Sequence, residues 1–203
     1  MLEALTGAGL ASAAGLNAYI PLLAIGLLAR YTDLIELPKT WSWISNGWVL
    51  VILCVLLAIE FVADKIPAVD SVNDIVQTVV RPTAGGLAFG AGSSSETVTV
   101  SDPASFFESK QWVPILIGIV MALGVHITKA TARPVINTMT LGVGAPVAST
   151  VEDTASAGLS VTAIIIPILI ILFLIGFVFF VWWMLRRRKR MKLARQAYAN
   201  QYR

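Results

Sequence analysis

Two carboxylates stand at the end of an apolar run of the sequence, one helical turn apart. Glu60 and Asp64 close a stretch that begins at Trp48 and contains no other charged residue before Lys65. A spacing of four residues places both carboxylates on one face of a helix. Because close carboxylates repel one another, we expect one of them to bind a proton or to exchange a cation.

A stripe of polar residues follows a chain break at a proline. Asp70, Asp74, Gln77 and Arg81 recur at intervals of three or four residues. They therefore share one face of an amphipathic helix that is predicted over residues 71–81. This stripe extends the acidic cluster and adds a positive charge to it.

A second cluster is basic. His126, Lys129 and Arg133 are three and four residues apart, so they share a helix face and offer an anionic group a counter-charge. Asn17 is a further candidate, because Pro21 removes the helical hydrogen bond to its carbonyl. The functional interpretation is a polar pathway or binding site where broken helices meet, as in transporters.

Both clusters also have a structural interpretation. Lys65, Lys129 and Arg133 fit positive residues at the cytoplasmic face of a membrane. Glu60 and Asp64 then act as their salt-bridge partners. The single histidine fits a hydrogen-bonded packing residue, and pairing of the freed main chain explains the asparagine equally well.

Helix caps account for other acidic residues. Asp70 and Asp74 fit caps of the amphipathic helix. Glu152 and Asp153 each follow a serine or threonine by three residues, which is the spacing of a capping box. We therefore predict that they mark the start of the last helix.

Signatures of soluble enzymes are absent from the sequence. It contains no phosphate-binding loop, no Gly-x-Ser-x-Gly motif and no metal-binding histidine pair. Cys54 is the only cysteine, which excludes an intramolecular disulfide and a cysteine-cluster metal site. We expect neither catalysis nor a cofactor nor a bound metal. A membrane enzyme that acts through carboxylates is a less favoured alternative.

Composition indicates an integral membrane protein. Hydrophobic residues make up 57% of the 203 residues and charged residues only 13%, against about a quarter charged in soluble domains. Residues 159–185 contain no charge and as a helix would exceed the roughly 30 Å hydrocarbon core.

A basic tail, residues 186–203, follows this segment. It holds eight of the 15 Lys and Arg residues, and such clusters remain cytoplasmic. We expect it to contact anionic lipid headgroups rather than nucleic acid, because it emerges directly from a membrane span. The predicted lipid-contacting residues are Arg186, Arg187, Arg188, Lys189 and Arg190.

The predicted fold is an all-α, polytopic transmembrane helix bundle within residues 1–185. Its six membrane segments, two of them discontinuous or re-entrant, are residues 2–28, 48–65, 71–92, 112–129, 134–148 and 159–185. Both termini are then inside, and the polar segment of residues 93–111 is outside. Four spans with two re-entrant hairpins fit nearly as well. A faint internal repeat aligns residues 58–65 with residues 122–129.

Several motifs carry a family resemblance. Residues 15–23 (GLNAYIPLL), residues 63–70 (ADKIPAVD), Arg81-Pro82 and residues 149–153 (STVED) together resemble the DUF4126 family of bacterial membrane proteins. The resemblance covers most of residues 2–185. It implies the cytoplasmic membrane of a bacterium, and it supplies no substrate and no established site residue.

Two functions follow from these features. The first is a small transporter or channel for an ion or small polar solute, which uses the intramembrane carboxylates and the basic cluster. The second is a non-catalytic accessory or scaffolding subunit that packs in a homo-oligomer or a larger membrane complex through Gly/Ala-rich helix faces. A water-filled cavity that reaches the carboxylates favours the first, and a solid core favours the second.

Overall fold

A computed structural model describes residues 1–93, 112–141 and 143–201. Every regular element among these residues is helical, so the predicted all-α fold is confirmed for the described part of the chain. The chain divides into two compact units, Met1–Ile170 and Ile171–Arg203, and the described residues of the second belong to one helix.

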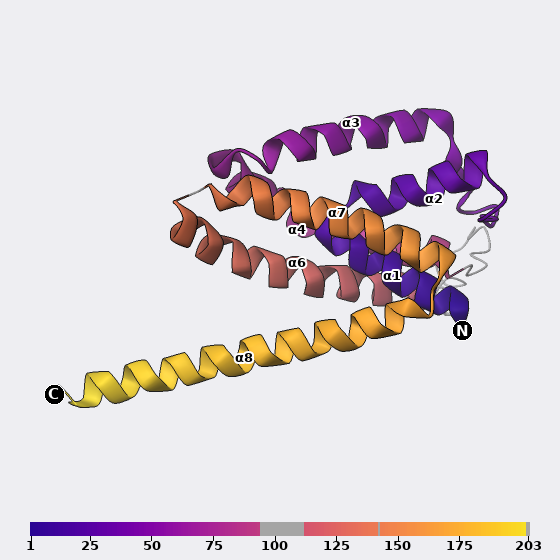
Figure 1. Cartoon of the computed structure of the whole chain (residues 1–203). Coiled ribbons are helices and arrows are strands. Elements are labelled where there is room, and N and C mark those ends of the chain that lie inside the picture. The colour runs from indigo at the N-terminus through magenta and orange to yellow at the C-terminus, as the bar shows by residue number, and fades with distance from the viewer. Residues whose placement is uncertain (94–111, 142, 202–203) are drawn as a thin grey trace. The chain divides into compact units, whose positions relative to one another are not determined.

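Figure 1 shows the helices of the described residues. They are α1 (Leu2–Leu16), α2 (Tyr19–Tyr31), the short 3-10 helix η1 (Ser42–Ser45), α3 (Gly47–Ala63), α4 (Pro67–Gly92), α6 (Trp112–Thr140), α7 (Gly144–Ile165) and α8 (Leu169–Gln201).

A chain reversal at Asn17 separates α1 from α2. Asn17 has extended main-chain angles, with φ −143° and ψ 125°, which end α1. Its side-chain oxygen accepts hydrogen bonds from the main-chain N–H groups of Tyr19 at 3.0 Å and Ile20 at 3.2 Å. These are among the first N–H groups of α2, which have no partner inside the helix, so Asn17 caps the second helix as it ends the first.

The two helices form a hairpin. Leu2 and Thr6 from α1 line the same hollow as Leu34 and Glu36, which follow α2. The open ends of the hairpin therefore lie together, as Figure 1 shows. Its tip, at Asn17, belongs to the Met1–Ile170 unit. The prediction of one helix over residues 2–28 is wrong, because the chain turns back at Asn17.

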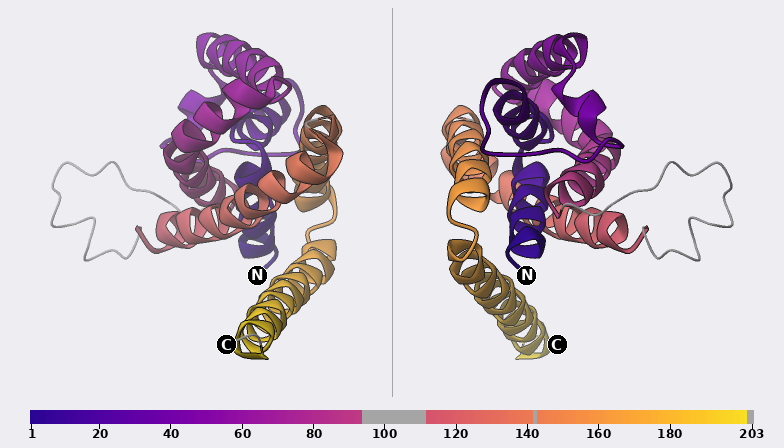
Figure 2. Two further views of the ribbon diagram at one scale, coloured as in Figure 1. Left: turned by 90° about the vertical axis from the view of Figure 1, so that its left-hand side faces the viewer. Right: turned by 90° about the vertical axis from the view of Figure 1, so that its right-hand side faces the viewer.

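The other helices of this unit run between its two ends in alternating directions. Figure 1 shows α3, α4, α6 and α7 doing so in turn. α1 contacts α4, α6 and α7, and it lies among them when the unit is viewed along the helices (Figure 2). Every residue from Gly7 to Gly15 is buried.

Small residues allow the central helices to approach closely. A side chain at Gly15 would place a Cβ atom 2.6 Å from the main-chain oxygen of Ala122. Gly85 of α4 and Gly118 of α6 face each other with no space for a side chain on either. This close packing of α1, α4 and α6 fixes the positions of the polar side chains that the same helices carry.

Two prolines lie inside helices without ending them. α4 continues through Pro82 and α6 through Pro134, because in an apolar bundle the remaining main-chain groups still need helical partners. Pro21 lies in the first turn of α2, where its missing N–H costs nothing. Pro167 lies in the turn between α7 and α8, not within a helix.

The segment boundaries change accordingly. Residues 71–92 belong to a helix that begins at Pro67, and residues 112–129 to one that continues to Thr140. Residues 134–148 are no separate span, because they comprise the end of α6 and the start of α7. Residues 159–185 are divided between α7 and α8, and α8 extends into the basic tail as far as Gln201.

Two helices of the described residues are long and apolar enough to cross a bilayer. They are Trp112–Thr140 and Leu169–Arg187. Leu2–Leu16, Tyr19–Tyr31 and Gly47–Ala63 are shorter apolar helices. α1 and α2, the two helices of the hairpin, are thus each too short to cross a bilayer alone.

Candidate functional site

Asp64 joins three positive side chains at the end of α3. Its Oδ2 atom lies 3.3 Å from Nη2 of Arg133 and 3.9 Å from Nη2 of Arg81. The ammonium nitrogen of Lys129 is also 3.9 Å from this oxygen. The other carboxylate oxygen accepts a hydrogen bond of 2.6 Å from the side-chain amide of Asn73. Asp64 is therefore the centre of a buried ionic network.

Arg81 of α4 connects Asp64 to a second carboxylate and to the histidine. Its Nη2 donates to Oε1 of Glu60 at 2.7 Å, and its Nη1 lies 3.1 Å from Nδ1 of His126. Because arginine only donates, Nδ1 accepts and the imidazole proton is on Nε2. That N–H lies 3.1 Å from the hydroxyl oxygen of Thr78. His126 is therefore neutral in this arrangement.

Glu152 of α7 bridges the two remaining cations. One oxygen, Oε2, lies 2.7 Å from Nζ of Lys129 and 2.7 Å from Nη2 of Arg133. Both contacts are charge-assisted hydrogen bonds, which are roughly twice as strong as neutral ones. Through these cations Glu152 is linked to Asp64, so four helices share one network.

The tip of the α1–α2 hairpin is bonded to the same network. Lys129 donates to the main-chain oxygen of Leu16 at 3.0 Å, and Asn17 donates to Oδ1 of Asp153 at 2.9 Å. Ser156 of α7 donates to a main-chain oxygen of α1 at 3.0 Å. Side chains from α6 and α7 thus hold the point at which the chain reverses.

The network combines equal numbers of acidic and basic groups. The members are Glu60, Asp64, Arg81, Lys129, Arg133 and Glu152. The side chain of Glu152 is 16% exposed, whereas that of Arg133 is only 5% and those of the other members are lower still. Chemically, such a chain of contacts can hold an ion or pass a proton between carboxylates.

Several buried acceptor atoms have no donor among the described residues. They are Oε2 of Glu60, Oε1 of Gln77, Oδ1 of Asp74 and Oδ2 of Asp153. A buried acceptor without a partner costs free energy, so these oxygens favour a proton, water or a cation nearby. No group of three His, Cys, Asp or Glu residues suited to a metal ion occurs in the part of the chain that the structure describes.

The structure merges the two predicted clusters into one. Asp64 and Arg81 contact the basic cluster of α6 directly, and Glu60 is joined to it through Arg81. Lys65 points elsewhere and is half-buried, with its ammonium 3.2 Å from the centre of the Phe61 ring. Its predicted pairing with the acidic cluster is therefore wrong.

The other predicted residues of the α4 stripe differ in position. Gln77 lies one turn and Asp74 two turns before Arg81 on α4, and Asn17 occupies the hairpin tip. The side chain of Asp70 lies outside the described residues.

Sequence reasoning missed the contribution of α7. Glu152 and Asp153 were predicted as caps, but both lie inside α7, which begins at Gly144. Asn73 and Thr78, which hydrogen bond to the network, were not predicted as site residues. One signal could have identified the two acids: they fall within a motif that also carries the family resemblance.

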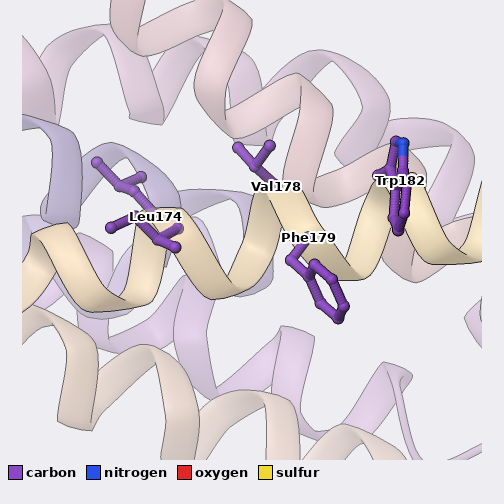
Figure 3. A pocket seen from close by; sticks show the side chains of 5 residues that line it. Leu174, Val178, Phe179 and Trp182 are labelled. Carbon is purple, nitrogen blue, oxygen red and sulfur yellow. The ribbon is translucent and has the colours of Figure 1, made fainter.

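Two hollows of the described residues differ in the groups that line them. One is lined by Leu174, Ile175, Val178, Phe179 and Trp182 along α8, and it is almost wholly apolar (Figure 3). An apolar helix face of this kind offers no group for ion chemistry and suits contact with hydrocarbon. A different hollow, between the end of α6 and the start of α7, reaches Glu152.

Two of the predicted lipid-contacting arginines lie over tryptophan rings. The guanidinium carbon of Arg186 lies 4.0 Å from the ring centre of Trp182, and that of Arg187 lies 5.3 Å from that of Trp183. Arg190 lines a hollow with all four. The side chains of Arg188 and Lys189 lie outside the described residues.

A family model, described as a domain of unknown function (DUF4126), matches residues 4–187. No curated protein and no solved structure is detectably similar to the chain. The matched residues include the whole ionic network and the hairpin. Because the match covers nearly the entire sequence, the chain belongs to the DUF4126 family.

Proposed function

We propose that this protein is a small multi-pass membrane transporter or channel for an ion or small polar solute, and that the ionic network is its site. One observation carries the proposal. Six charged side chains from four helices meet inside the bundle, bonded to the tip of a broken helix. Transporters place their binding sites where helices are broken near the middle of the membrane.

The distribution of side chains supports a membrane location. On α3, Val51, Ile52 and Val55 are each more than half exposed, whereas Glu60 is 1% exposed. A soluble protein buries its apolar residues and exposes its charges. The reversed pattern suits a helix that faces lipid and turns its carboxylate toward the interior. The proposed location is the cytoplasmic membrane of a bacterium.

The hairpin changes the topology that we infer. α1 and α2 enter and leave on one side as a re-entrant hairpin, and α3, α4, α6, α7 and α8 cross in turn. With the basic tail in the cytoplasm, residues 93–111 stay outside, as expected from the sequence. The N-terminus moves outside, in place of the cytoplasmic position that six spans required.

Energetics also favour a functional role for the network. Buried ion pairs gain little or no stability over apolar side chains of similar volume, because their desolvation is costly. Six such groups are therefore poorly explained by stability alone. Glu60 and Asp64 are each 1% exposed, as in the solid core that favours an accessory subunit, so transport requires a second conformation in which the bundle opens to these carboxylates.

The test is solute flux through the purified protein in liposomes. The variant Glu60→Gln keeps the shape of the side chain and a hydrogen bond to Arg81 but removes one charge of the network. We expect it to fold and to lose or uncouple flux. Glu36→Gln, which changes an exposed carboxylate outside the network, is the matched control.

A further inference from the structure

An open hollow lies between the end of α6 and the start of α7. Its lining is apolar along most of its length and includes Ile136, Val143, Val147 and Val151, and Glu152 contributes the charged group. Glu152 follows Gly144, the first residue of α7, by eight residues, which is about 12 Å along the helix axis. The hollow thus leads from the α6–α7 turn to the ionic network.

Glu152 is the member of the network that reaches this hollow. Its side chain is 16% exposed, whereas those of Lys129 and Arg133 are 3% and 5% exposed. A single carboxylate oxygen accepts from both cations at 2.7 Å. Two cations converging on one oxygen is also how proteins hold the oxyanion of a ligand.

We propose that Glu152 occupies the place of an anionic substrate, and that a small organic carboxylate with a short apolar body displaces it. The carboxylate enters through the hollow, binds Lys129 and Arg133 and leaves its apolar body against the valine-lined wall. The inference rests on the proposed transport function and names its substrate class.

The lining favours this class over an inorganic anion. An apolar wall gives an inorganic anion nothing to contact, whereas each buried CH₂ group of an organic anion tightens binding by roughly fourfold. A bilayer lipid does not fit the hollow, because its charged and apolar parts would lie in the opposite order. Its headgroup would lie at the α6–α7 turn with its chains deeper, whereas here the cations lie deeper than the apolar wall.

Chemical rescue of a truncated side chain tests the proposal. Glu152→Ala removes the internal carboxylate and leaves Lys129 and Arg133 short of a counter-charge. Propionate should then raise the unfolding midpoint of the variant in lipid nanodiscs, and the uncharged isostere propionamide should not. Acetate should need a concentration roughly fourfold higher for half of the effect, because it lacks one CH₂ group.

The matched control is Glu60→Ala. It removes a carboxylate paired with Arg81 but in an enclosed position, where the side chain is only 1% exposed. Propionate should not rescue it. In the wild type, half of the effect should require at least about tenfold more propionate than in Glu152→Ala, because the ligand competes with Glu152. If the alanine variant does not fold, Glu152→Gln replaces it with the same expectations.

The outcomes separate this inference from the proposed function. Rescue of the Glu152 variant by propionate, but not by propionamide, supports the proposed carboxylate site. This holds even if liposomes show no flux of any solute. Absence of rescue, equal rescue by propionamide, or equal rescue of Glu60→Ala overturns it, even if liposomes show flux of another ion.

Discussion

The ammonium group of Lys129 donates a hydrogen bond of 3.0 Å to the main-chain oxygen of Leu16, the last residue of α1. Carbonyl groups at the end of a helix have no partner in the helix, and the partial negative charge there favours a cation. The same ammonium contacts Glu152 at 2.7 Å. A change of charge in the network is therefore expected to loosen the hairpin tip.

Replacement of this lysine should destabilise the protein and free the hairpin. Lys129→Met leaves Glu152 without one of its two cations, and removal of one partner of a buried ion pair costs about 3–5 kcal/mol. Hydrogen exchange should accelerate at residues 13–20. Lys65→Met is the control, because Lys65 is only half-buried and its ammonium lies over Phe61. Equal losses in both variants would show that the bond to Leu16 contributes nothing.

Asp64 should be the most sensitive acidic position for stability. Its Oδ2 lies within 4.0 Å of three cations, and its side chain is 2% exposed. Asp64→Asn leaves an uncompensated positive charge inside the bundle, at a cost of about 3–5 kcal/mol. The exposed control Asp33→Asn should change the free energy of unfolding by less than about 0.5 kcal/mol. Denaturant unfolding in detergent measures both, and a loss at Asp64 no greater than at Asp33 would refute its central role.

Membrane topology can be tested with single cysteines in a Cys54→Ser background. A cysteine at Glu3, which is exposed near the start of α1, reports the N-terminal end of the hairpin, and one at Ser94 reports the connection that follows α4. Both should react with an impermeant thiol reagent in intact cells. A cysteine appended after Arg203 should react only after lysis. Protection of Glu3→Cys with labelling of Ser94→Cys would restore an N-terminal helix that crosses the membrane.

Removal of the tail should leave the first compact unit intact. Deletion of residues 191–203 removes the end of α8, which lies within the Ile171–Arg203 unit. The unfolding midpoint in detergent should change by no more than a few degrees. Binding to anionic liposomes should weaken, since each basic residue near such a surface contributes about 1 kcal/mol. A large loss of thermal stability would show that the tail stabilises the fold.

The sequence predicted the elements of the site better than their connections. Spacings of three and four placed His126, Lys129 and Arg133 on one face. In the structure Lys129 and Arg133 contact the same two acids, Asp64 and Glu152, and His126 contacts Arg81. Local periodicity is sufficient for such a prediction, because it depends only on the geometry of one helix. Which helices meet depends on packing between distant segments, so the merger of two clusters could not be read from the spacings.

The chain reversal at Asn17 shows a second limit. Pro21 was the visible helix breaker, but it lies in the first turn of α2, where a proline is tolerated. The break comes from Asn17, whose side chain caps the following helix and bonds to Asp153, 136 residues away in the sequence. A contact over this separation leaves no local signal. Glu152 and Asp153 likewise have the local spacing of caps, although they lie inside α7, and their distant partners leave no mark on that spacing.

Solute flux through reconstituted protein tests the central claim most directly. Liposomes with a pH-sensitive dye, under imposed cation and anion gradients, should show flux with the wild type and with the Glu36→Gln control. Glu60→Gln should abolish or uncouple flux while its unfolding curve stays cooperative. Equal flux from the wild type and Glu60→Gln, or no flux from either under any gradient, would contradict the account and leave the accessory subunit as the better interpretation.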